Sequence, residues 1–293
     1  MVFNLIFIAL IIAVVAFIAA AWRIADSVIK SPREVRPDDW QAAGLTPEFL
    51  RFPAGDGVEL AGAFVRGTNP ATILLLHGYG HSKTQLLPQA KFLHAAGFSL
   101  FLFDFRGSGE SGGEFITFGE EEKFDLTGAV RYLHSRQDVD HRRLGIFGFS
   151  MGGSVALLTS AGLPEVRAIA VDSSYGEFRS LIESNFREYL GKLPFFPLGN
   201  LVLYLIKVRT GAYFGDIRPS AHLKKLKDIP LLLIHGTHDK TIPVWDTLRM
   251  HATASGPAEL MIVKGAGHTG TYTTAGEKYS TKLVDFFRTH LEG

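Results

Sequence analysis

A serine flanked by glycines follows a short apolar run and precedes a helical pattern. Leu144–Phe147 leads into Gly-Phe-Ser-Met-Gly-Gly, which places Ser150 between Gly148 and Gly152. A serine on a sharp turn between strand and helix exposes its hydroxyl at the edge of a sheet. The residues two before and two after it must then approach each other, and only hydrogen side chains fit comfortably there. The pattern therefore predicts a nucleophilic serine at position 150.

A serine hydroxyl needs a base to remove its proton, and an imidazole base needs an acid to orient it. Two later apolar runs each lead into such a residue. The run Pro230–Ile234 is followed by Asp239, and the run Leu260–Val263 is followed by His268. The order serine, acid, histidine is typical of this strand-turn-helix motif. We therefore expect His268 to deprotonate Ser150 and Asp239 to orient His268.

A second carboxylate competes for the role of the acid. Asp172 follows the apolar run Val166–Val171, so it also lies at the end of a predicted strand. Sequence alone leaves two interpretations of Asp172 open, an alternative acid and a turn residue that closes its strand.

Besides a nucleophile, a base and an acid, the proposed chemistry needs a pair of amides that stabilise the negative charge on the substrate oxygen. The run Thr72–Leu76 leads into His-Gly-Tyr-Gly, whose glycines free the backbone to turn its N–H groups toward the serine. We predict that the amides of Tyr79 and Met151 donate to this oxyanion, since losing one such donor generally costs about 3 kcal/mol. His77 is expected to brace the loop, and Asp104 and Arg106 are expected to form a structural pair.

Strands and helices alternate from residue 58 onward, which predicts a mostly parallel sheet with helices on both faces. An antiparallel hairpin is expected first, because Val58–Val65 alternates after the turn signal Gly-Asp-Gly. Further strands are predicted by the apolar runs named above and by Ser99–Phe103. Helices are predicted at Gln85–Ala95, Glu120–His134, Met151–Ala161, Trp245–Ala254 and Gly276–His290.

A long apolar connection interrupts this alternation. Nearly sixty residues separate Val171 from the next strand, far more than an ordinary connection, and many of them are aromatic or aliphatic. We predict a helical cap insert at residues 173–228 over the carboxyl edge of the sheet, where ligands bind in open α/β folds. Either a lid packed on the sheet or a pocket for an apolar acyl or alkyl group would explain its aromatic residues. The pocket residues would be Phe195, Phe196, Leu201, Leu203 and Tyr204.

The chain opens with an apolar segment. Leu5–Trp22 contains no polar or charged side chain and would form a helix of about 27 Å, close to the thickness of the bilayer core. A single-pass transmembrane anchor is the first interpretation, and a cleaved signal peptide or a buried core helix are alternatives. The first charges after it are basic, which predicts a cytoplasmic domain. We therefore expect an anchor at 1–22, a tether at 23–50 and one domain at 51–293.

Composition excludes several function classes. The 293 residues include 30 Lys or Arg and 29 Asp or Glu, and this net charge of +1 argues against a nucleic-acid partner. The chain has no cysteine, hence no disulfide or thiolate site. The histidines at 235, 238 and 268 lack a carboxylate-rich cluster, so no metal and no other cofactor is expected. Two G-x-G-x-x-G matches, at 107–112 and 265–270, lack the helix and strand that a dinucleotide site needs.

The motifs together resemble those of α/β-hydrolases from Val58 to the C-terminus, and are similar in particular to membrane-tethered serine hydrolases of the BEM46-like group. The matching segments occur in the same order: His77–Gly80, Asp104–Gly113, Gly148–Gly153, His235–Pro243 and Gly265–Thr269. The resemblance implies an α/β-hydrolase fold and hydrolysis of acyl esters or thioesters, with small-molecule, lipid or acylated-protein substrates. A serine peptidase or amidase with the same three residues, and a non-catalytic membrane-tethered binding protein, are the alternatives.

Overall fold

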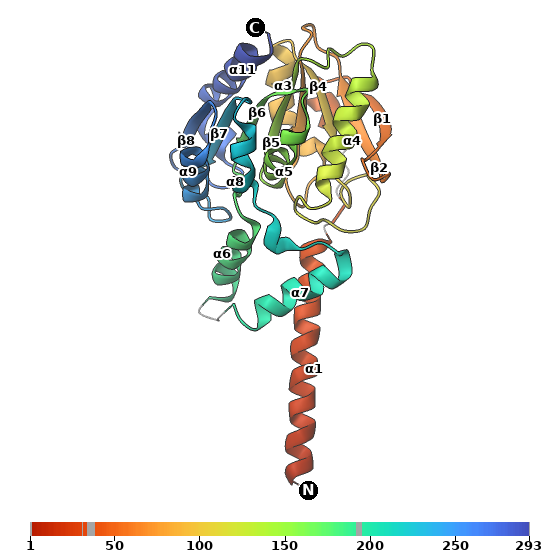
Figure 1. The fold of residues 1–293 in the computed structure, drawn as a ribbon, viewed down its shortest axis with the longest axis vertical. Helices are drawn as coiled ribbons and strands as arrows, with labels where there is room; N and C mark the ends of the chain where they lie inside the picture. Colours follow the sequence, from red (N-terminus) through yellow and green to blue (C-terminus); the bar gives the residue numbers. More distant parts are fainter. Residues whose placement is uncertain (1, 31, 34–38, 192–194, 293) are drawn as a thin grey trace.

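A single eight-stranded sheet forms the centre of the domain in the computed structural model (Figure 1), which describes residues 2–30, 32–33, 39–191 and 195–292. The strand order is β1-β2-β4-β3-β5-β6-β7-β8. β1 and β2 form the predicted antiparallel hairpin, β2 is also antiparallel to β4, and all other pairs are parallel. The strands are β1 (Glu48–Pro53), β2 (Glu59–Val65), β3 (Thr72–Leu76), β4 (Ser99–Phe103), β5 (Leu144–Phe149), β6 (Val166–Asp172), β7 (Leu231–Gly236) and β8 (Ala258–Val263).

Helices cover both faces of this sheet, as the continuous apolar strands predict. Every residue of β3, β4, β5 and β7 is buried, because two apolar clusters enclose them from opposite sides. One cluster joins the sheet to α3 and α11, and the other joins it to α4, α5 and α9. These helices are α3 (Leu87–Ala95), α4 (Glu122–Ser135), α5 (Met151–Thr159), α9 (Val244–Thr253) and α11 (Glu277–Leu291).

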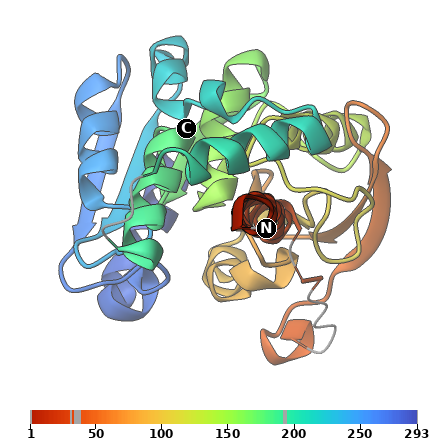
Figure 2. The ribbon, with the colours of Figure 1, turned by 90° about the horizontal axis from the view of Figure 1, so that it is seen from below.

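The connection between β6 and β7 is helical, as predicted. It contains α6 (Phe178–Leu190), α7 (Leu198–Thr210) and the short α8 (Pro219–His222), with 192–194 of the predicted insert outside the described residues. Figure 1 shows α6 and α7 on one side of the sheet, and Figure 2 shows α7 crossing beside the N-terminal helix α1 (Val2–Ile29). Besides α1, the described residues also contain α2 (Asp39–Ala42) and α10 (Thr271–Ala275), and short 3-10 turns lie at Lys83–Leu86, Ser160–Gly162, Phe214–Asp216 and Leu223–Leu226.

The N-terminal helix is longer than the predicted anchor. α1 (Val2–Ile29) is long and apolar enough to cross a membrane, and no other helix in the described ranges is. Its side chains are exposed over residues 2–20, but Ala21, Ala25 and Ile29 are buried in the apolar cluster of the domain. Their spacing of four places them on one face of the helix.

Regular elements extend into the predicted tether from both ends. Residues 23–29 continue α1 because their buried face contacts the domain, and Glu48 to Leu50 already pair with β2 in the hairpin. Within the predicted tether, residues 31 and 34–38 lie outside the described part of the chain.

Candidate active site

Ser150 sits on a strained turn between β5 and α5. Its backbone has φ 51° and ψ −116°, a region that residues with a side chain rarely adopt, and its amide donates to the carbonyl of Asp172 at 2.8 Å. A Cβ on Gly148 would lie 2.6 Å from the carbonyl carbon of Gly152, and one on Gly152 would lie 2.2 Å from the carbonyl oxygen of Leu76. The two glycines thus permit the turn, which presents the serine side chain at the carboxyl edge of the sheet.

The structure brings Ser150, His268 and Asp239 together. They lie in the segments that follow β5, β8 and β7, whose carboxyl ends meet at one edge of the sheet. The Ser150 hydroxyl is 3.1 Å from Nε2 of His268, and Nδ1 of His268 is 2.7 Å from Oδ2 of Asp239. An imidazole hydrogen-bonded in this way can accept the serine proton at Nε2 while its Nδ1–H stays on the carboxylate.

Asp239 is held as a carboxylate. Its Oδ1 accepts hydrogen bonds from the amides of Thr241 and Ile242, both at 2.9 Å. Burial favours the neutral acid, but the hydrogen bonds from His235 and His268 outweigh burial and lower the pKa of Asp239 to about 2. Asp239 therefore stays negatively charged near neutral pH.

His235 is a second histidine at the carboxylate, and sequence analysis considered it only as a metal ligand. Its Nε2 lies 3.2 Å from Oδ2 of Asp239 and 2.8 Å from the carbonyl of Ile242, and its Nδ1 lies 2.7 Å from the Thr247 hydroxyl. Burial opposes protonation of His235, but the hydrogen bond with Asp239 prevails and raises the pKa of His235. The only signal in the sequence for a contact between His235 and Asp239 was a polar residue at the end of the apolar strand β7.

Asp172, the alternative acid, is engaged elsewhere. Its carboxylate is fully buried and accepts hydrogen bonds from the hydroxyls of Thr271 at 2.5 Å, Tyr279 at 2.8 Å and Ser173 at 3.0 Å. Burial raises the pKa of Asp172, although these hydroxyls act in the opposite direction. Since Nδ1 of His268 is bonded to Asp239, the geometry favours the turn-residue interpretation of Asp172.

The two predicted oxyanion donors occupy turns at the same sheet edge. Met151 is the first residue of α5, and the first amides of a helix have no acceptor within it. The loop of Tyr79 follows β3, and His77 braces it by donating from Nδ1 to the carbonyl of Gly78 at 2.7 Å and accepting from the amide of Phe105 at 3.0 Å. Burial lowers the pKa of His77 to about 4, so this ring is neutral near pH 7.

Comparison with known proteins places this geometry in a family. Residues 85–293, which contain Ser150, Asp239 and His268, match the model of the prolyl oligopeptidase family. The chain belongs to this family. The Pyrococcus furiosus esterase Pf2001 superposes with a TM-score of 0.77 at 24% identity, over 90% of this chain and 99% of that one, which confirms the α/β-hydrolase fold.

Several known proteins align with most of the length of this chain. YqkD of Bacillus subtilis (strain 168), an uncharacterized protein, is 30% identical over 80% of this chain and 77% of its own length. YfhR of Escherichia coli (strain K12), also uncharacterized, is 29% identical over 85% of this chain and 82% of its own length. The bem46 protein of Schizosaccharomyces pombe is 24% identical over 73% of this chain and 66% of its own length. The predicted membership of the α/β-hydrolases is thereby confirmed, with bem46 among the relatives.

Four aromatic rings, called the aromatic wall below, lie next to one another from the loop of Tyr79, which is the oxyanion loop, to the cap. The ring of Tyr79 stacks on Phe118 with centroids 4.9 Å apart. Phe118 in turn contacts Phe178, which opens α6, at 4.5 Å, and Phe178 contacts Phe214 at 4.9 Å. Sequence analysis missed these rings because they come from three separate connections and share no local pattern.

The five cap residues predicted to line the substrate pocket are instead divided over different surfaces. Phe195 packs against Phe186, and Phe196 is 68% exposed. Along α7, Leu201 packs against the domain, whereas Leu203 and Tyr204 line a shallow groove and Tyr204 is 62% exposed. A helix turns by about 100° per residue, so neighbouring positions face different directions. The structure therefore does not bring these five side chains together.

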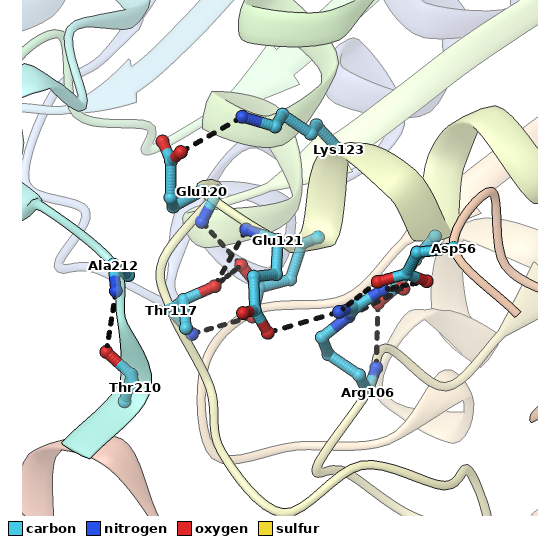
Figure 3. Close-up of polar contacts among 11 residues, drawn as sticks. Asp56, Arg106, Thr117, Glu120, Glu121, Lys123, Thr210 and Ala212 are labelled. Carbon is cyan, nitrogen blue, oxygen red and sulfur yellow. Dashed lines mark hydrogen bonds and ion pairs between the residues drawn. The ribbon is translucent and has the colours of Figure 1, made fainter. Parts of the chain in front are cut away.

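Asp104 and Arg106 fix their loop, but not as the predicted pair. Asp104 accepts from Nζ and the amide of Lys83, both at 2.7 Å. The Arg106 guanidinium instead contacts Asp56 at 2.8 Å, Asp125 at 2.7 Å and Glu121 at 3.1 Å, as Figure 3 shows for Asp56 and Glu121. The two side chains therefore bind different partners and stabilise different parts of the loop.

Proposed function

We propose that this protein is a membrane-anchored serine hydrolase that cleaves carboxylic or thio esters of apolar acyl or alkyl groups. The observation that carries the proposal is the hydrogen-bonded series Ser150–His268–Asp239 on a strained turn. In the first step Nε2 of His268 takes the hydroxyl proton, and Oγ of Ser150 bonds to the ester carbonyl carbon. The amides of Tyr79 and Met151 would hold the oxyanion.

The acyl-enzyme then forms when the tetrahedral intermediate collapses. The bond to the alcohol or thiol breaks, and His268 returns its proton to the leaving group. In the second half, His268 takes a proton from water, whose oxygen attacks the acyl carbon. Ser150 leaves as the alcohol with that proton, and the carboxylic acid is released. Asp239 stays ionised and orients His268 throughout.

The apolar surroundings of the Tyr79 loop support an ester over a peptide. Behind this loop lie the buried rings of Phe118, Phe178 and Phe214, and the Tyr79 hydroxyl already donates to the carbonyl of Ser27 at 2.9 Å. A peptide backbone buried in apolar surroundings would lose its hydrogen bonds to water without replacement, whereas an acyl chain has none to lose. A serine peptidase or amidase remains the second candidate because of the family match.

A retained anchor explains α1 better than a cleaved signal peptide. The exposed, apolar part of the helix is continuous with the buried positions Ala21, Ala25 and Ile29, so the same helix belongs to both membrane and domain. The basic residues after the apolar run favour a cytoplasmic domain by the positive-inside rule. Protease digestion of the domain in sealed vesicles of known orientation tests this side.

The substrate class can be tested by comparing two series of chromogenic compounds. We expect the full-length protein in detergent to hydrolyse p-nitrophenyl esters, with kcat/KM rising from acetyl to octanoyl, and to be labelled by a fluorophosphonate. Aminoacyl p-nitroanilides should be cleaved at least about 100-fold more slowly. Preferred cleavage of the anilides would support the peptidase, and absence of both labelling and turnover would support a non-catalytic binding protein.

A further inference from the structure

The domain end of α1 contacts the loops that build the proposed site. The Tyr79 hydroxyl donates to the carbonyl of Ser27 at 2.9 Å, which ties the oxyanion loop to the helix. The amide of Ile116 donates to the carbonyl of Ile29 at 2.8 Å, two residues before the wall residue Phe118. The last turns of α1 thus lie at the carboxyl edge of the sheet, as Ser150 does.

Charged contacts fix the angle at which α1 leaves the domain. Asp26 accepts a hydrogen bond from the Arg209 guanidinium of α7 at 2.6 Å, and that guanidinium also lies 4.8 Å from the ring of Trp22. Lys30 pairs with Glu114 at 3.2 Å, and Arg33 donates to the carbonyls of Ser111 and Gly113. Contacts with two separate connections hold a helix more firmly than one attachment point could.

The exposed part of α1 leaves the domain on the side where the cap helices α6 and α7 lie. Figure 1 shows residues of α1 continuing past α7, and Figure 2, seen along the helix, shows α1 beside α7 beneath the domain. A bilayer that holds the exposed residues 2–20 would therefore lie against the cap and not against the opposite edge of the sheet.

We propose that the site opens onto the membrane surface beside residues 21–29 of α1 and takes acyl esters that reside in the bilayer. This inference rests on the proposed ester hydrolase. A lipid presents its ester groups at the interface, next to the depth at which α1 enters the domain. The Tyr79 hydroxyl contacts Ser27 at that depth, so a lipid ester there lies near the loop that carries a proposed oxyanion donor.

The test compares esters presented in and out of the membrane. Full-length protein is reconstituted into phosphatidylcholine vesicles and given p-nitrophenyl butyrate in solution, or a phosphatidylcholine with a fluorogenic acyl ester. The lipid is placed either in the same vesicles or in separate ones. We expect cleavage in the same vesicles to be at least about tenfold faster than in separate vesicles at equal total concentration.

The variant Arg209→Ala removes the contacts of α7 with Asp26 and Trp22 of α1. It should lower cleavage of the lipid ester in the same vesicles by about tenfold and change butyrate hydrolysis by less than about threefold, because misplacement affects delivery and not the reacting groups. Arg142→Ala is the matched control, since Arg142 is exposed next to the amino end of β5. It should change neither rate.

A second variant tests the same inference in case Arg209→Ala does not fold. Ala25→Leu adds volume to a fully buried position of α1 and keeps the helix apolar, so it should separate the two substrates in the same direction. The inference is overturned if wild type hydrolyses butyrate but not the lipid ester, if it cleaves lipid in both vesicle populations equally, or if both variants lower the two rates alike. Hydrolysis of neither substrate would instead refute the proposed function.

Discussion

Replacement of Ser150 by alanine is expected to lower kcat/KM for a p-nitrophenyl ester by about 10⁴- to 10⁶-fold. The hydroxyl oxygen 3.1 Å from His268 is the only group of that turn that can form the acyl-enzyme in the proposed mechanism. Residual turnover would come from water attacking a substrate polarised by the oxyanion amides, which retains part of the rate when the nucleophile is removed. Fluorophosphonate labelling should disappear with the activity.

The matched control for this variant is Ser135→Ala, at an exposed serine at the end of α4. It should leave rate and labelling unchanged. Alanine at 150 keeps the strained backbone and removes no hydrogen bond besides that to His268, so the melting temperature should move by only a few degrees. Equal labelling of Ser150→Ala and wild type would exclude Ser150 as the nucleophile.

The second large effect is expected for Asp239→Asn, which should lower kcat by about 10³- to 10⁴-fold. An asparagine keeps the shape of the side chain but removes the charge that stabilises the imidazolium of His268, and its amide group favours the wrong imidazole tautomer. The low pKa of Asp239 means that wild type carries this charge at every pH from about 4 upward. Raising the pH should therefore not restore the variant.

Asp172→Asn is the decisive comparison for the choice of acid. Asp172 accepts three hydroxyl hydrogen bonds and none from His268, so we expect a loss of thermal stability and a change in kcat of less than about tenfold. Stopped assays with the same ester on both purified variants make the comparison. A larger loss of kcat in Asp172→Asn than in Asp239→Asn would reverse the assignment.

The sheet was predictable because its pattern is local. Thr72–Leu76 and Ser99–Phe103 are continuous apolar runs of strand length bounded by turn residues, and β3 and β4 have these same bounds. The turn at Ser150 was predictable for a related reason, because only glycine fits at positions 148 and 152 and glycine is therefore found at both. In such places one short segment contains the whole physical cause.

The contacts that sequence could not predict join segments far apart in the chain. Arg106 finds Asp56 fifty residues earlier, and the wall of aromatic rings draws on three connections. The direction of each α7 side chain depends on how the helix is rotated against its neighbours. That rotation is set by the packing of Val202 and Ile206, both buried, and it turns Tyr204 outward. Composition of the cap therefore indicated an apolar surface but not its arrangement.

The continuity of α1 from its exposed end into the domain has a practical consequence for anyone preparing the enzyme. Cutting the chain after Ile29 to obtain a soluble fragment would uncover the apolar surface against which Ala21, Ala25 and Ile29 pack, and would leave the Tyr79 hydroxyl without its acceptor. Such a fragment would tend to self-associate and would be a poor guide to native turnover. Solubility is better sought by exchanging outward-facing residues in the first two thirds of the helix for polar ones.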